Sequence, residues 1–135
     1  MRNRSVSMMM GLLAVTLLGA LVGGCAPVTI RGVVLPGEIT TIAVVNQDDP
    51  RLKTPGIAEV DVTIYQTGTQ GDVRSRTSND LGRFGVPLRG TGALSKPLTI
   101  EARGEGYSPV RKSMPTPTTN ERLLIYMQPL GSSQP

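Results

Sequence analysis

The chain has 135 residues, with 14 Lys and Arg against 10 Asp and Glu, so its formal charge is a mild +4. One Cys and no His exclude a zinc site of His and Cys ligands, a Ser-His-Asp or Cys-His catalytic arrangement, and an internal disulfide. Few aromatic residues and scattered charges argue against nucleic-acid binding, and the length suits one domain with a single core.

The first 25 residues have the three parts of an export signal. Arg2 and Arg4 give a basic start, and an uncharged apolar run over 6–22 follows. This run is short for a membrane-spanning helix, which needs about 20 apolar residues. The segment ends with Val22-Gly23-Gly24-Cys25, in the order aliphatic, small, small, Cys. It resembles the lipobox of bacterial lipoproteins.

That resemblance implies a diacylglyceryl group on Cys25, cleavage between Gly24 and Cys25, and acylation of the new amine, with palmitate as the expected label. Residues 1–24 are then the signal peptide, and residues 25–29 are the lipidated cysteine and a tether. The residue after the cysteine is Ala26 and not Asp. In enteric-type bacteria this would favour the outer membrane or cell surface over the inner membrane. Three alternatives remain open: an ordinary signal-peptidase site with a free thiol, an intermolecular disulfide, and an uncleaved anchor.

Beyond Pro27 the sequence predicts short β-strands separated by turns rich in Gly and Pro. Apolar and polar residues alternate in this part, and no segment keeps a helical period. The expected strands are residues 28–35, 39–45, 60–66, 73–78, 83–88, 98–103, 110–114 and 121–127. The pattern predicts an all-β fold, an antiparallel seven- or eight-stranded Greek-key β-sandwich in which each sheet buries one face. We expect a β-bulge at Gly32, an edge position for the polar strand 73–78, and a polar loop over 46–56.

Five short motifs follow one another between residues 32 and 107. They are Gly32-Val33-Val34, the Pro55-Gly56 start of a Val-rich strand, Ser78-Asn79-Asp80-Leu81-Gly82-Arg83-Phe84, the strand Leu98–Arg103, and Gly106-Tyr107. Together they resemble the carboxypeptidase regulatory-like domain, a transthyretin-like (prealbumin-like) sandwich, over residues 30–128. Residues 129–135 are a polar tail. Two features depart from that family: Asn79 replaces the usual Asp, and the segment 38–54 is longer than the usual turn.

The motif residues have mechanical explanations. Asn79 can hydrogen-bond to the backbone two residues ahead in an Asx turn, and Gly82 can adopt a positive φ. Phe84 is the only Phe, so we expect it to be a large anchor of the core. Gly106 and Tyr107 are expected to tighten another turn. These residues therefore predict fold maintenance and no ligand site.

Other polar residues permit competing interpretations. Asn46, Asp48 and Asp49 could offer oxygens to Ca²⁺, but they lack the glycine and distal carboxylate of a recognised loop, so a solvated acidic turn is favoured. The arginines at 74, 76 and 83 could form a basic strip for anionic lipid or polysaccharide, or a charged edge that blocks strand pairing. Tyr65 and Tyr126 could stack on sugar rings, but the chain has few aromatics and no Trp.

The sequence therefore predicts a non-catalytic lipoprotein of the bacterial cell envelope, anchored to the membrane, with an envelope protein or polysaccharide as its partner. No cofactor, metal site, catalytic residue or nucleic-acid partner is expected. Two alternatives remain: a hydrolase that uses Lys or carboxylates, and a secreted carbohydrate-binding module. The transthyretin-like folds include a purine-pathway hydrolase, but its activity relies on histidines, which this chain lacks.

Overall fold

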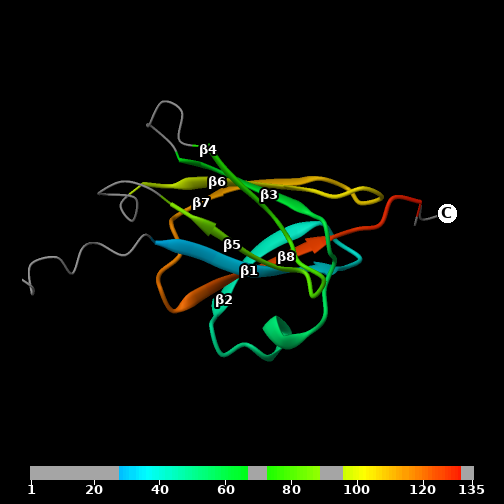
Figure 1. Ribbon diagram of the computed structural model, residues 1–135, viewed down its shortest axis with the longest axis horizontal. Coiled ribbons are helices and arrows are strands. Elements are labelled where there is room, and N and C mark those ends of the chain that lie inside the picture. Colours follow the sequence, from blue (N-terminus) through cyan, green and yellow to red (C-terminus); the bar gives the residue numbers. More distant parts are fainter. Residues whose placement is uncertain (1–27, 67–72, 89–95, 132–135) are drawn as a thin grey trace, which may run out of the picture.

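The computed structural model describes residues 28–66, 73–88 and 96–131, which form eight β-strands and one short 3₁₀ helix (Figure 1). The strands are β1 (Thr29–Pro36), β2 (Thr41–Asn46), β3 (Asp61–Gln66), β4 (Val73–Thr77), β5 (Arg83–Pro87), β6 (Leu98–Arg103), β7 (Val110–Met114) and β8 (Glu121–Met127). The helix η2 (Pro50–Lys53) lies between β2 and β3. The strand prediction is confirmed, and no strand end differs from its predicted place by more than two residues.

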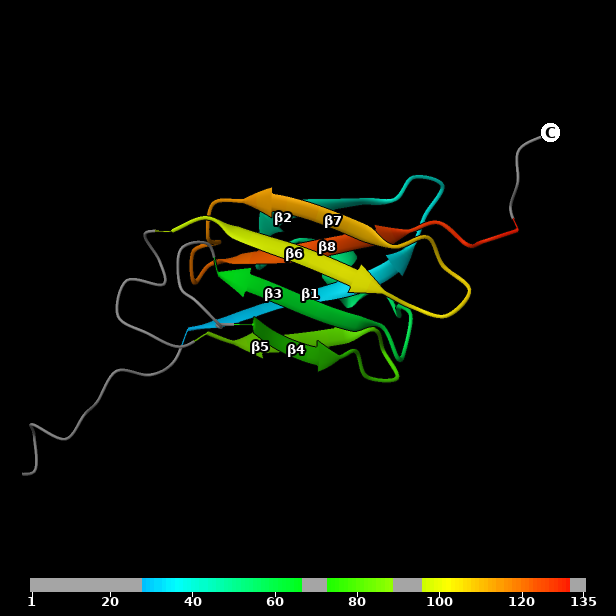
Figure 2. The same ribbon diagram turned by 90° about the horizontal axis from the view of Figure 1, so that it is seen from above.

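The strands form two four-stranded sheets that lie face to face (Figure 2). Sheet A has the order β2-β8-β1-β5, and sheet B has the order β4-β3-β6-β7. Of the six strand pairs in the described ranges, five are antiparallel, and the pair β1–β8 is parallel. The expectation of an antiparallel sandwich is wrong for this one pair. Parallel neighbours need a long connection, which the rest of the chain supplies between its first and last strands.

The main core lies between the sheets and takes alternate side chains from both of them. Its buried members are Ile30, Val34, Ile42, Val60, Val62, Ile64, Phe84, Val86, Leu88, Leu98, Ile100, Ala102, Val110, Met114, Leu123, Ile125 and Met127. The strand 73–78 was expected at an edge, and β4 is an edge strand of sheet B. At the opposite side, the Lys112 Nζ of β7 donates to Ile42 O of β2 at 2.9 Å, which joins the two sheets.

The outer face of sheet A carries a second apolar cluster. Val33, Leu35 and Leu124 are buried there, and Leu52 from η2 packs against them. Asp49 caps this helix by accepting a hydrogen bond from Arg51 N at 2.9 Å. The prediction that each sheet buries one face is therefore wrong for sheet A, because part of the long 38–54 segment covers its outer face.

Gly32 marks a close packing contact instead of a bulge. The register of β1 is continuous, and Gly32 lies opposite Phe84 on β5 and Leu123 on β8. A Cβ atom at Gly32 would overlap Leu123 O and lie 2.7 Å from Phe84 Cζ. The predicted bulge is wrong because the glycine makes room for the aromatic ring within a regular ladder.

Replacing Phe84 tests how much this packing contributes to stability. Phe84 is 6% exposed and contacts the main core, so Phe84→Ala is expected to lower the free energy of unfolding by about 3–5 kcal/mol. Urea unfolding followed by circular dichroism measures the loss. The control Leu81→Ala, at a side chain that is 45% exposed, should change stability by no more than about 0.5 kcal/mol. A loss below about 1 kcal/mol for Phe84→Ala would contradict the packing described.

Candidate functional site

Three of the sequence motifs meet at one backbone contact, which we call the glycine junction. It consists of Val34, Gly56, Ile57, Leu81 and Gly82. Three backbone hydrogen bonds of 2.8 Å hold it together. Val34 N donates to Gly82 O, Gly56 N donates to Leu81 O, and Ile57 N donates to Val34 O. The junction therefore ties β1 to the segment before β3 and to the turn between β4 and β5.

The two glycines of the junction leave no room for side chains. A Cβ atom at Gly56 would overlap Val34 O, and one at Gly82 would lie 2.6 Å from Gly56 Cα. Gly82 also has a φ of +76°, which side-chain-bearing residues rarely adopt. The motif glycines are therefore required by backbone approach.

The side chains of Asn79 and Ser78 form further hydrogen bonds to the backbone of the junction and of its neighbours. Asn79 Oδ1 accepts from Leu81 N and from Arg83 N, both at 3.0 Å, and so forms the expected Asx turn. Ser78 is 4% exposed; its Oγ accepts from Val60 N at 2.9 Å and donates to Ile57 O at 2.8 Å. Sequence reasoning gave Ser78 no role of its own.

The last motif joins the C-terminal end of the described chain. Gly106 has a φ of +82°, and its carbonyl accepts from Leu130 N at 2.8 Å. Tyr107 N donates to Gly104 O at 3.1 Å, and the partly buried tyrosine packs against the main core. These contacts give the pair a structural role.

Gly24 and Cys25, the expected cleavage and lipidation positions, lie outside the described residues. The part of the chain that is described contains no helix long and apolar enough to cross a membrane.

The acidic turn before η2 is held by its own hydrogen bonds. Asp49 Oδ2 pairs with Arg51 Nη2 at 2.7 Å, and the Arg51 side chain lowers the pKa of the Asp49 carboxyl. Asn46 Oδ1 accepts from Asp48 N at 3.0 Å. In residues 28–66, 73–88 and 96–131, no group of three His, Cys, Asp or Glu residues could hold a metal ion.

The three arginines around β4 and β5 do not form one strip. Arg74 and Arg76 lie opposite the core residues Ile64 and Val62, so they share the inner side of the edge strand β4. Arg83 lies on the outer face of sheet A. Arg74 and Arg76 therefore resemble the inward-pointing charges with which natural sheets discourage edge pairing.

The outer face of sheet B is a polar surface built around Glu101. Its carboxylate accepts from Arg103 Nε at 2.6 Å and from Arg111 Nη1 at 3.2 Å. The Arg103 hydrogen bond, with the charges of both arginines, lowers the pKa of Glu101. The Arg111 guanidinium also lies 5.2 Å from the centre of the Tyr65 ring, and Tyr126 packs on the second cluster. Both tyrosines are therefore already engaged by protein groups.

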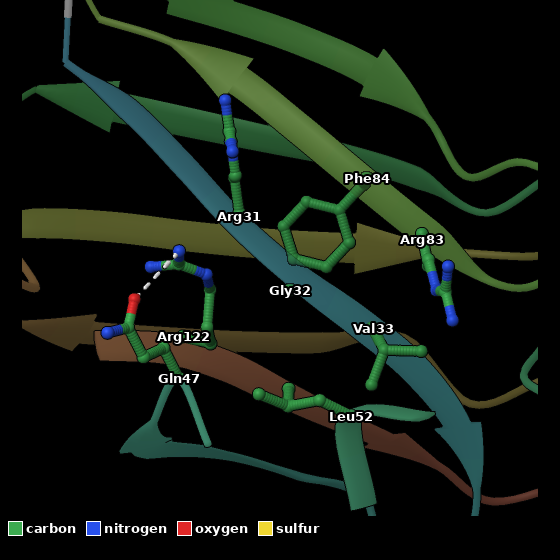
Figure 3. A pocket seen from close by; sticks show the side chains of 8 residues that line it. All are labelled: Arg31, Gly32, Val33, Gln47, Leu52, Arg83, Phe84 and Arg122. Carbon is green, nitrogen blue, oxygen red and sulfur yellow. Dashed lines mark hydrogen bonds between the residues drawn. The ribbon is translucent and has the colours of Figure 1, made fainter. Parts of the chain in front are cut away.

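A cavity of about 260 Å³ opens on the outer face of sheet A, and we call it the arginine pocket (Figure 3). Its lining consists of Arg31, Gly32, Val33, Gln47, Leu52, Arg83, Phe84 and Arg122. Figure 3 shows Leu52 beside Val33 and Arg122 turned toward Gln47. The lining thus combines three arginines with the apolar residues Val33, Leu52 and Phe84.

Strand register places the three arginines on one face. Arg31 precedes Gly32 on β1, and Arg122 precedes Leu123 on β8, so the two lie side by side on parallel neighbours. Arg83 lies diagonally from Arg31, on β5. Gly85 lies directly opposite Arg31, and a Cβ atom placed there would lie 3.3 Å from Thr29 Cγ2 and 3.8 Å from Arg31 Cγ.

Sequence reasoning missed Arg31 and Arg122 as partners. They are far apart in the chain and meet only through the parallel β1–β8 pair, which strand periodicity does not reveal. For Arg83, the sequence suggests a grouping with Arg74 and Arg76 on β4, and not with Arg31 and Arg122. Alternation alone could have placed Arg31 on the same face as Val33.

No protein-family model, no curated protein and no solved structure matches this chain.

Replacing the junction glycine Gly82 tests whether crowding fixes its identity. Gly82→Ala is expected to lower the free energy of unfolding by more than about 3 kcal/mol, because strain at positive φ adds to a backbone clash. The matched control is Gly106→Ala, since Gly106 also has positive φ but nothing within 4 Å of an added Cβ. Its expected loss is about 1–2 kcal/mol. Equal losses in urea unfolding would mean that crowding at Gly82 contributes nothing.

The lowered pKa of Glu101 predicts a pH dependence of stability. Its folded pKa lies below its ordinary value of 4.5, so the ion pairs stabilise the fold above that pH and lose this effect as the pH falls through the folded pKa. Melting temperatures of wild type and Glu101→Gln should therefore differ most above about pH 5 and converge toward about pH 2. The exposed Glu105→Gln is the control. A difference that stays constant across this range would contradict the assignment.

Proposed function

We propose that this protein is a lipid-anchored, non-catalytic module of the bacterial cell envelope that binds or supports a partner at the membrane surface. The observation that carries the proposal is the closeness of the lipobox to the folded domain. Strand β1 begins at Thr29, four residues after Cys25. At about 3.3–3.6 Å per residue, this tether spans no more than about 14 Å. A lipid on Cys25 would hold the two sheets close to the bilayer.

The fold that we propose for this module is the prealbumin-like Greek-key sandwich of the carboxypeptidase regulatory-like domain. The glycine junction supports this assignment because it gives one physical reason for two motifs of that family, the Pro55-Gly56 start and the Asn79–Phe84 turn. Each motif supplies one of the two glycines that touch. The long 38–54 segment is an addition to that fold, part of which covers the outer face of sheet A.

The lowered pKa values of three carboxyl groups support a role without catalysis. Asp49, Glu101 and Glu121 each have a pKa lowered by hydrogen-bond donors: the Arg51 side chain, the Arg103 side chain and the Thr118 backbone. A carboxyl that serves as a general acid near neutral pH needs a raised pKa instead. These three groups have the properties of structural carboxylates.

The anchor is tested by metabolic labelling in a bacterial host. Labelled palmitate should enter the wild-type chain and be absent from Cys25→Ser, because the chain has one cysteine to carry the lipid. The wild type should also partition into the detergent phase. Ala26→Asp is the matched control: it should keep the label and, in an enteric-type host, move the protein toward the inner membrane. Equal labelling of wild type and Cys25→Ser would refute the proposal.

A further inference from the structure

We infer that the arginine pocket is a binding site for a phosphate group carried by a small anionic ligand. This inference goes beyond the proposed function, because it concerns the outer face of sheet A and does not require a lipid on Cys25. It rests on the placement of three positive charges, on the lining between them, and on the fixed strands that present them.

The charges of the pocket are not compensated by the protein. Within the described residues, no carboxylate oxygen lies within 4.0 Å of the three guanidinium groups, and the side chains of Arg31 and Arg83 have neither hydrogen bond nor ion pair. Arg122 donates to two backbone carbonyls, Thr119 O and Glu121 O, both at 2.8 Å. The Glu121 carboxylate accepts instead from Thr118 N at 2.9 Å. Three like charges on one face repel each other, and a bound anion would remove this repulsion.

Three other described arginines have carboxylate partners, whereas Arg74 and Arg76 on the edge strand β4 have none in the described ranges. Arg51 pairs with Asp49, and Arg103 and Arg111 pair with Glu101. Carboxylates thus neutralise arginines on the helix η2 and on the outer face of sheet B. An external anion is the missing partner in the pocket.

The backbone brings the three side chains within reach of one ligand. Arg31 and Arg122 lie on adjacent strands, which are about 4.8 Å apart, and Arg83 is a diagonal neighbour of Arg31 at about 7–8 Å. Rotation about side-chain bonds is therefore enough to direct all three guanidinium groups at one anion. Arg122 would then exchange its long 3.5 Å contact with Gln47 for a bond to the ligand.

The chemistry of the three groups favours phosphate over a single carboxylate. A guanidinium presents planar pairs of N–H donors that match the oxygens of phosphate or carboxylate. One carboxylate has one negative charge and two oxygens, which one or two arginines satisfy. A phosphate monoester carries about −1.5 to −2 charges at pH 7 and three terminal oxygens, so it can engage all three arginines.

The size of the pocket limits what else is bound. Its volume of about 260 Å³ lies just below the roughly 300–1,000 Å³ of typical small-molecule sites. Val33, Leu52 and Phe84 give it an apolar lining against which the carbons next to the phosphate could pack. A second cavity of about 270 Å³ shares Arg31 and Arg122 and extends over Thr118 and Thr119. The ligand therefore has room for a polar group beyond its phosphate.

Isothermal titration of the full chain in a non-ionic detergent tests this inference, with inorganic phosphate as the probe. Wild type should bind phosphate saturably, and binding should weaken as salt is added, because exposed charges are screened. Arg31→Gln and Arg83→Gln should each weaken binding about five- to tenfold, since each removes one charge-assisted contact. Both side chains are free of other hydrogen bonds within the described ranges, so neither change should disturb folding.

The matched control is Arg76→Gln, which removes the same charge from the edge strand β4 outside the pocket. Its phosphate affinity should stay within about twofold of wild type. Absence of saturable binding to wild type would overturn the inference. Equal weakening in Arg76→Gln and Arg31→Gln would also overturn it, because net charge alone would then explain the effect.

A second arm identifies the source of the phosphate, either a lipid headgroup or a free ligand. Vesicles that contain phosphatidic acid, and matched vesicles of phosphatidylcholine alone, compete with inorganic phosphate for wild type. Displacement by phosphatidic acid alone that is lost in Arg31→Gln assigns the pocket to a headgroup. Phosphate binding that neither vesicle displaces assigns it to a soluble ligand. Displacement that persists in Arg31→Gln places the headgroup outside the pocket and contradicts the headgroup assignment.

Discussion

The fold depends on the approach of three backbone segments at the glycine junction. β1, the segment before β3 and the turn before β5 come close enough there for the carbonyl of Val34 to meet the bare Cα of Gly56, and Gly56 to meet Gly82. Only glycine allows this approach, and the hydrogen bonds across it satisfy backbone groups that could not otherwise be buried. Because β1 belongs to sheet A and β3 to sheet B, the junction also fixes one sheet relative to the other.

The glycine junction also determines where the arginine pocket forms. Gly82 is followed directly by Arg83 and Phe84, so the turn that closes the junction also sets the faces of those two residues. Phe84 turns inward over Gly32, and Arg83 turns outward beside Val33. Arg31 then lies on the same outer face through the alternation of β1, and Arg122 joins it through β8. The arginine pocket is thus a consequence of register, and part of the 38–54 segment supplies its remaining wall through Gln47 and Leu52.

The sequence predicts the strands and the turn chemistry well, because both depend on local patterns. Alternation finds all eight strands, and the residue types of Asn79 and Gly82 predict the geometry of their turn. Prediction from the sequence fails where contacts join segments that are distant in the chain. The parallel β1–β8 pair, the second cluster under η2 and the meeting of Arg31 with Arg122 depend on tertiary pairing, which no local pattern encodes. At Gly32 the sequence permits two explanations for a glycine in a strand, a bulge or close packing, and the choice depends on the Phe84 ring of another strand.

The most direct test of the account is native-state hydrogen exchange at the amides of the glycine junction. If the junction holds the sheets together, Val34, Gly56 and Ile57 should exchange only when the whole domain unfolds, with the same free energy as core amides such as that of Ile100. Gly56 and Ile57 lie outside the strands, so ordinary segments of this kind would open locally and exchange sooner. Exchange of these two amides by local opening, while the core amides remain protected, would contradict the account.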